Sequence, residues 1–136
     1  MSRWVAIALG AISALGMQAL FDLLTAQAGL GRLAVAHYLG LFAALVLGGY
    51  VAGHLVRRWH ALHGALAAAT FIFVSVTINA LREAPVAREL GLQALPPIDF
   101  VQLTITDLLA MTGGSWGGWL AGYWNRRGEG LDRLER

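Results

Sequence analysis

The sequence contains no cysteine and no lysine, and only 13% of its 136 residues are charged. The absence of cysteine excludes disulfides, thiolate metal sites and thiol catalysis. All ten basic residues are arginine, and the formal net charge is only +2. The sequence shows no strongly basic face, so nucleic-acid binding is not predicted. Proline occurs three times, at positions 85, 96 and 97, so the strongest helix breaker is confined to one stretch.

The usual catalytic motifs are also missing. The chain has no Gly-x-Ser-x-Gly elbow, no phosphate-binding loop and no His-Glu-x-x-His pair, so no enzymatic activity is predicted. Ser115 follows two glycines, but no base is expected at its depth, and helix packing explains it better than a nucleophile does. His54, His60 and His63 have metal-ligand spacing but no evident third ligand type. We therefore predict neither a metal nor a cofactor.

Four long apolar segments dominate the rest of the chain. Hydrophobic residues make up 57% of the sequence, and the mean hydropathy of +0.61 is high for a soluble domain. Each segment offers about 20 or more mostly apolar residues, enough to cross a hydrocarbon core of about 30 Å as a helix. They span residues 4–26, 34–56, 61–81 and 100–124. We predict an all-α, four-transmembrane-helix bundle, with residues 1–136 forming one domain in the lipid bilayer.

The first segment has a second interpretation as a cleaved signal. Ala26-Gln27-Ala28 has the small-x-small pattern of a cleavage site. The apolar run is long for a signal, however, and Asp22 interrupts it before that site. A retained helix is therefore predicted.

Arginines in the short flanks predict the orientation. If the N-terminus is cytoplasmic, three arginines lie outside (Arg32, Arg82 and Arg88) and seven lie inside (Arg3, Arg57, Arg58, Arg126, Arg127, Arg133 and Arg136). The positive-inside rule then predicts that both termini are cytoplasmic. Six aromatic residues fall near the same inner interface, as in an aromatic belt: Trp4, Tyr50, Trp59, Trp119, Tyr123 and Trp124.

Two non-spanning stretches are predicted. Residues 82–99 form an outer loop, either an amphipathic segment on the membrane surface or an ordinary ordered loop, and Asp99 is available to cap the last helix. Residues 125–136 are charged and contain glycine, which indicates a solvated cytoplasmic tail.

The ends of the second and fourth segments resemble each other. Residues 48–58 and 117–127 match at six of eleven positions at an offset of 69. An offset of 57 pairs the first segment with the third, aligning Gln18 with Ser75 and Asp22 with Asn79, although this half of the match is weak. The sequence therefore predicts two parallel-repeat helical hairpins, related by a pseudo-two-fold axis along the membrane normal.

Small residues recur every four positions in a glycine-zipper pattern. Those predicted to pack helices are Gly48, Gly49, Gly53, Gly114, Gly118 and Gly122. Lipid tails are as apolar as leucine, so close backbone contact drives helix association in a membrane, and glycine permits that contact. The faces are predicted to pack within one chain, or between copies or partner subunits.

Polar residues inside the spans are the candidates for chemistry. The main ones are Asp22, His37, Asn79 and Asp107, with Gln18, Gln102 and Thr106 in the same outer half. Asp107 lies eight residues past Asp99, roughly 12 Å along its helix. A carboxylate in mid-membrane costs about 2.5–3.5 kcal/mol, so Asp107 should face the bundle, be protonated or find a hydrogen-bond donor. Its spacing of seven from Gly114 supports an inward position. These residues either exchange protons or hold a cation, or they join helices by hydrogen bonds.

One family resemblance can be given. The residues Gly48-Gly49, Gly53 and His63-Gly64-Ala65-Leu66, followed by a glycine-rich fourth segment, resemble a small four-helix bacterial membrane family of unknown function with a Gly-Gly…Gly…His-Gly signature. The resemblance implies a location in the bacterial inner membrane and no known activity.

The sequence therefore predicts a membrane protein that acts through helix packing, as a homo-oligomer or as an accessory subunit of a larger membrane complex. The alternative is a small proton- or ion-coupled transporter centred on Asp107. The sequence does not identify the transported substrate or ligand of such a carrier.

Overall fold

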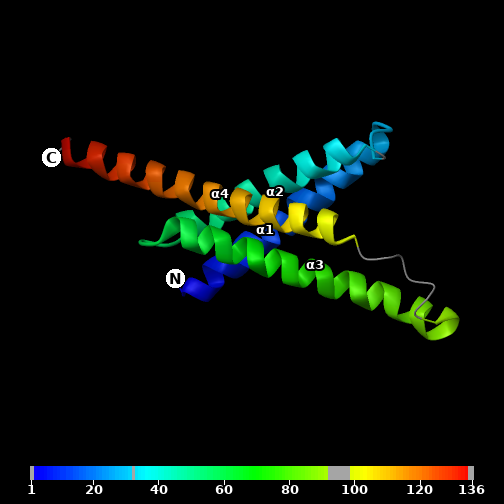
Figure 1. Ribbon diagram of the computed structural model, residues 1–136. Coiled ribbons are helices and arrows are strands. Elements are labelled where there is room, and N and C mark those ends of the chain that lie inside the picture. Colours follow the sequence, from blue (N-terminus) through cyan, green and yellow to red (C-terminus); the bar gives the residue numbers. More distant parts are fainter. Residues whose placement is uncertain (1, 32, 92–98, 135–136) are drawn as a thin grey trace.

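The computed structural model describes residues 2–31, 33–91 and 99–134, and these residues are almost entirely helical. The four helices are α1 (Arg3–Gln27), α2 (Ala34–His54), α3 (His60–Leu90) and α4 (Phe100–Leu134). They run alternately in opposite directions, so that the N-terminus, the α2–α3 connection and the end of α4 lie toward one end of the molecule (Figure 1). We call this the inner end and the opposite end the outer end.

Two helices are longer than the sequence predicted. α3 continues to Leu90 although Pro85 lies inside it, and α4 continues through the predicted tail to Leu134. A proline removes one backbone donor, and here it lies near the exposed outer end of a helix that is otherwise continuous. The predicted outer loop therefore begins about nine residues later than expected. Its remaining residues 92–98 lie outside the described part of the chain.

Local signals end the first helix and begin the last. Gly29 has a φ of +71°, a conformation that glycine adopts at little cost. Its N–H donates to the Ala26 carbonyl at 3.1 Å, and the N–H of Leu30 donates to the Thr25 carbonyl at 2.8 Å, which is the Schellman pattern. At α4, Asp99 Oδ1 accepts from the N–H groups of Val101 and Gln102 at 3.0 Å, as expected for a capping aspartate.

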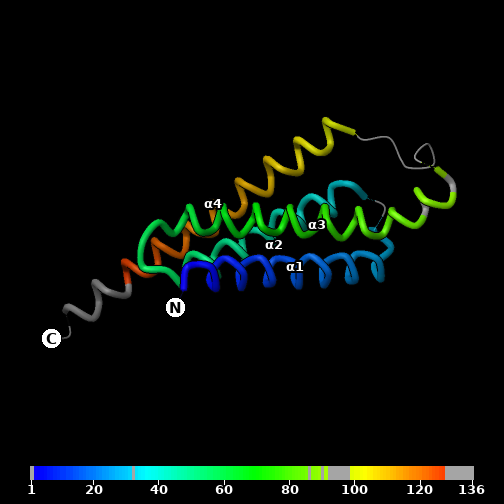
Figure 2. The backbone as a smooth tube through the Cα atoms, turned by 90° about the horizontal axis from the view of Figure 1, so that it is seen from below, coloured from blue at the N-terminus to red at the C-terminus, as the bar shows by residue number. Residues whose placement is uncertain are grey.

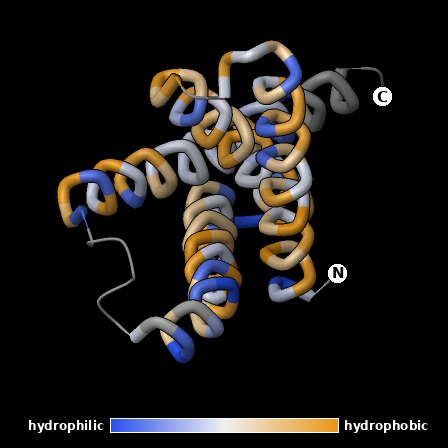
Figure 3. The backbone as a smooth tube through the Cα atoms, turned by 90° about the vertical axis from the view of Figure 1, so that its right-hand side faces the viewer, coloured by the Kyte–Doolittle hydropathy of each residue, from blue (hydrophilic) through white to orange (hydrophobic). Residues whose placement is uncertain are grey.

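Three helices are long and apolar enough to cross a membrane: α1, α2 and residues 60–89 of α3. Only 28%, 33% and 28% of their most apolar windows are buried, so most of this apolar surface faces outward. Orange segments accordingly recur on all sides of the helices in Figure 3. Such helices are typical of a membrane protein. α4 does not reach the same hydropathy, because glycines, tryptophans and Asp107 take the place of aliphatic residues there.

The centre of the fold is the crossing of α2 with α4. α1 packs against α2, α3 packs against α4, and α3 also contacts both α1 and α2, whereas α1 and α4 do not touch within the described residues (Figures 1 and 2). The shared apolar core is small and contains mostly short side chains: Ala14, Leu41, Leu45, Ala68, Phe71 and Ala110.

Buried positions recur at the two offsets seen in the sequence. Among the described residues, each buried position of α3 lies 57 residues after a buried position of α1, and each one of α4 lies 69 residues after one of α2. The α3 set is His63, Gly64, Ala67, Ala68 and Phe71; the α4 set is Ala110, Gly113, Gly114, Gly117, Gly118, Ala121 and Gly122. Only Gln18 and Gly40 have half-buried counterparts instead, Ser75 and Leu109.

Candidate functional site

The six predicted packing glycines are buried at helix contacts within the chain. A Cβ built at any of them would lie closer than 3.0 Å to an atom across the contact. At Gly49 that atom is the carbonyl oxygen of Gly114, and at Gly53 it is the Cα of Gly118, at 2.8 Å. Both contacts join α2 to α4. The glycine-lined faces therefore build the core of a single chain.

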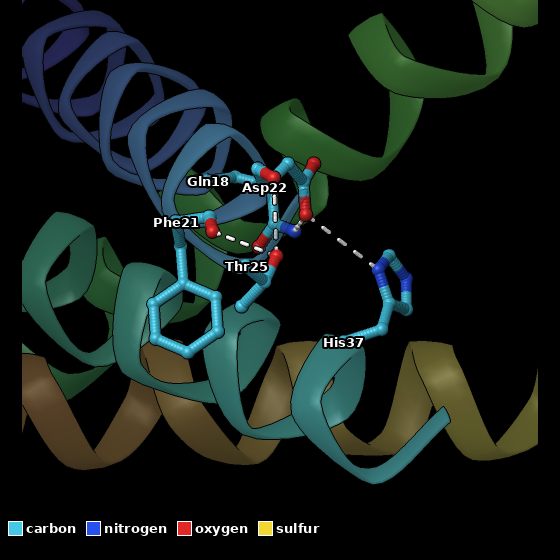
Figure 4. Close-up of polar contacts among 5 residues, drawn as sticks. All are labelled: Gln18, Phe21, Asp22, Thr25 and His37. Atoms are coloured by element: carbon cyan, nitrogen blue, oxygen red, sulfur yellow. Dashed lines mark hydrogen bonds and ion pairs between the residues drawn. The ribbon is translucent and has the colours of Figure 1, made fainter. Parts of the chain in front are cut away.

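Three of the predicted polar residues meet between α1 and α2. Gln18 Nε2 donates to Asp22 Oδ1 at 2.8 Å, and His37 Nδ1 lies 3.8 Å from the same oxygen (Figure 4). The Asp22 and His37 side chains are 54% and 52% exposed, and both line a hollow of about 290 Å³. Gln18 is 9% exposed, and its Oε1 has no hydrogen-bond partner among the described residues. We call Gln18, Asp22 and His37 the outer polar cluster.

Asp107 does not join this cluster. Asp107 is half-buried on α4 and lies on the same helical face as Gly114. No hydrogen bond or ion pair links its side chain to another described residue. Asn79 is exposed on α3 and is likewise not part of the outer polar cluster. The predicted convergence of Asp22, His37, Asn79 and Asp107 is therefore only partial. α1 and α4 do not touch, which keeps Asp22 and Asp107 apart.

The outer halves of α3 and α4 diverge from each other, as Figure 2 shows most plainly. Residues 76–83 and 100–105 are exposed at every position, so the residues that the structure describes cover no face of either segment. The hydroxyls of Thr77 and Thr104 donate to carbonyls of their own helices at 2.8 Å. By contrast, no hydrogen bond of the Asn79 or Gln102 carboxamide is found among the described residues.

Two of the three histidines at the inner end donate hydrogen bonds to backbone carbonyls. His60 Nδ1 donates to the Gly53 carbonyl at 2.7 Å, and His63 Nδ1 donates to the Trp59 carbonyl at 2.9 Å. These bonds tie α3 to the end of α2 and to the turn before α3. Within residues that the structure describes, no group of three or more His, Cys, Asp or Glu side chains is placed to hold an ion.

The inner end contains two adjoining hollows that the sequence analysis missed. One, of about 560 Å³, is lined by Arg3, Arg57, Arg58, Trp59 and His63 with two apolar residues; we call it the arginine hollow. The other, of about 680 Å³, shares Arg57, Arg58 and Trp59 with the first and also reaches His54, His60, Asn125 and Arg126. The arginines at positions 3, 57 and 58 are visible in the sequence, where they predict only the orientation of the chain. That the first and third helices begin side by side follows only from the fold.

No family model, curated protein or solved structure matches this chain. The resemblance to the small bacterial membrane family with the Gly-Gly…Gly…His-Gly signature therefore stays a prediction.

Proposed function

We propose that the protein is a four-helix integral membrane protein that acts through contacts with other membrane helices, as a homo-oligomer or as an accessory subunit. We place it in the bacterial inner membrane with both termini in the cytoplasm. The inner end supports this orientation, because Arg3, Arg57 and Arg58 gather around one hollow there, whereas among the described residues the outer end has Arg82 and Arg88.

The packing of α4 supports a fourth crossing. α4 contacts both α2 and α3, and the middle of α4 is buried against them through Gly114, Gly117 and Gly118. A helix that touches two spanning helices along its centre occupies the same layer as they do. The low hydropathy of α4 is then explained by its glycines. They contact other helices of the protein, and a helix face that contacts protein does not need to be as apolar as one that contacts lipid.

The recurrence of buried positions supports two parallel-repeat hairpins. Sequence identity at the offset of 69 involves residues near the inner end, whereas matched burial extends over residues 6–14 with 63–71 and over residues 41–53 with 110–122. At the contact between α1 and α3, a Cβ on Gly10 would lie 3.0 Å from the Cβ of Ala67, its counterpart at the offset of 57. Equivalent residues therefore meet there, as expected near a pseudo-two-fold axis.

The observation that carries the proposal is the pair of unsatisfied carboxamides on the diverging helix halves. Asn79 and Gln102 lie in the outer halves of spans, where an unpaired polar group is costly. Side chains of this type hydrogen-bond across helices in membranes. The glycine faces are used within the chain, so we assign contact with another copy or a partner to the exposed outer halves of α3 and α4, where these carboxamides lie.

Replacing Asn79 by leucine should weaken association. We expect the dimer dissociation constant in vesicles to rise about threefold to thirtyfold, because an interhelical hydrogen bond in a membrane contributes about 0.6–2 kcal/mol. The chain has no cysteine, so a single Ser2→Cys substitution gives one labelling site for energy-transfer measurements over a range of protein-to-lipid ratios.

The matched control is Thr77→Val, two residues away on the same exposed segment. The Thr77 hydroxyl already donates to Phe73, so its loss should leave association unchanged. If the chain alone stays monomeric at all ratios, extraction from native membranes should recover a second membrane protein that Asn79→Leu releases. A monomer in both settings would contradict the proposal.

A carrier is the second candidate, and the outer polar cluster favours it more than Asp107 does. The Gln18 Oε1 atom is buried and unpaired beside Asp22, and the adjacent hollow is open. Such an arrangement suits a transient proton or cation better than a permanent helix contact. The alternative centred on Asp107 has no comparable cluster around it among the described residues.

Proteoliposomes distinguish the two candidates. If packing is the function, a pH gradient across vesicles containing the protein should decay at the rate of empty vesicles, and Asp22→Asn and Asp107→Asn should both leave that rate unchanged. A faster decay in the native protein that Asp22→Asn abolishes and Asp107→Asn preserves would establish a carrier at the outer polar cluster.

A further inference from the structure

We infer that the arginine hollow binds the phosphate of an anionic phospholipid headgroup at the inner membrane surface. The inference rests on the membrane location proposed above and is independent of helix association. Its volume of about 560 Å³ falls within the range of about 300–1,000 Å³ typical of ligand sites.

The first argument is the charge of the lining. Arg3, Arg57 and Arg58 converge on the hollow from the start of α1 and from the α2–α3 turn, and none of the residues lining it is acidic. Guanidinium groups bind phosphate oxygens through paired hydrogen bonds in a fixed planar geometry. Three of them without a counter-charge form a site for an anion, and basic pockets on the cytoplasmic side of helix bundles suit phospholipid headgroups.

The second argument comes from two uncapped helix N-termini. α1 begins at Arg3 and α3 begins after Trp59, and residues of both first turns line the hollow. Neither N-cap residue makes a side-chain capping bond, and neither first turn contains an acidic residue. The first N–H groups of a helix have no partner within it and carry a partial positive charge. Two such ends beside three arginines favour a bound anion.

The carbonyl groups at the C-terminus of α2 already accept hydrogen bonds. α2 ends at the same level, but the Gly53 carbonyl accepts from Val56 N–H at 3.4 Å and from His60 Nδ1 at 2.7 Å. The His54 carbonyl accepts from Asn125 Nδ2 at 3.5 Å. The carbonyl end of α2 is therefore occupied while the N–H ends of α1 and α3 remain open. This asymmetry also favours the arginine hollow over its neighbour, which His54 lines.

The turn that presents the arginines is held in a strained conformation. Trp59 has a φ of +61° and a ψ of +40°, which is unusual for a bulky residue and costs free energy. The N–H and Nδ1 of His63, a residue only 6% exposed, both donate to the Trp59 carbonyl. These bonds hold the turn with its arginines beside Arg3, and they leave Nε2 as the remaining polar atom of the buried His63 ring.

Native mass spectrometry of the detergent-purified protein tests the inference. We expect phosphatidylglycerol to bind at least about tenfold more tightly than phosphatidylcholine. Arg57→Gln/Arg58→Gln should reduce phosphatidylglycerol binding about tenfold, since charge-assisted hydrogen bonds are lost. The matched control is Arg126→Gln/Arg127→Gln, which removes the same charge at the equivalent positions of α4 but does not touch this hollow. It should change binding less than about twofold.

Three results would overturn the inference. Equal binding of the two lipids by the native protein would exclude an anion site, and this measurement needs no variant. An equal loss in both double variants would place the lipid in the neighbouring hollow, which Arg57, Arg58 and Arg126 line, or on diffuse surface charge, and either would overturn the assignment. Displacement of the lipid by millimolar inorganic phosphate would assign the hollow to a soluble anion instead. If the Arg57→Gln/Arg58→Gln protein does not fold, Arg3→Gln should still weaken phosphatidylglycerol binding, and unchanged binding there would also contradict the assignment.

Discussion

Gly49→Leu should abolish the native fold or destabilise it by about 3 kcal/mol or more. Even the Cβ at this position would collide with the carbonyl oxygen of Gly114, a backbone atom that cannot turn aside. Overpacking a tight contact ordinarily costs about 1–3 kcal/mol, and the leucine adds three further carbons beyond the first collision. The measurement is the fraction of folded protein in mixed detergent as the denaturing detergent increases.

Gly16→Leu is the control for this prediction. Gly16 lies within α1, is exposed, and a Cβ there would have no atom within 4 Å. The same chemical change should therefore alter stability by less than about 0.5 kcal/mol. Equal effects at both sites would mean that the α2–α4 crossing is not where the backbones meet.

Phe71→Ala should destabilise the fold by about 2 kcal/mol. Phe71 is 6% exposed and belongs to the shared core with Leu45 and Ala110. In a soluble core such a change costs about 3–5 kcal/mol, of which part is transfer from water. That part largely disappears in a bilayer, because lipid is as apolar as the core, whereas the lost packing and the cavity remain.

Phe73→Ala provides the comparison, since Phe73 lies two residues away on α3 and is 73% exposed. Acyl chains would fill the space it leaves, so thermal or detergent unfolding should shift by less than about 0.5 kcal/mol. A larger effect at Phe73 than at Phe71 would contradict the packing of α3 described above.

Hydrophobic length predicted where the helices lie but less well where they end. The bounds of α1 and α2 agree with the predicted spans within two residues at each end. The sequence predicts an end of the third helix before Pro85, whereas α3 continues to Leu90, because a proline near a helix end removes only one donor. The capping role of Asp99 was confirmed, since a single side chain and its next neighbours decide it.

The polar contacts were harder to predict, because they depend on which helices touch. Depth along a helix can be read from residue number, so Asp22, His37 and Asp107 were placed in one layer. Whether they meet depends on the crossing of α2 with α4, which separates α1 from α4. The arginine hollow escaped prediction for the same reason: Arg3 and Arg57 are distant in sequence and become neighbours only when the first and third helices begin side by side.

The contacts of Gly49 with Gly114 and of Gly53 with Gly118 also bear on biogenesis. Each joins residues that the ribosome delivers 65 positions apart. The first hairpin, closed by its tight turn at Gly29, can enter the bilayer well before its partner exists. In the proposed topology, the glycine surface of α2 would face acyl chains or neighbouring proteins until the second hairpin is inserted, and the final assembly step would be lateral docking of the two inserted halves.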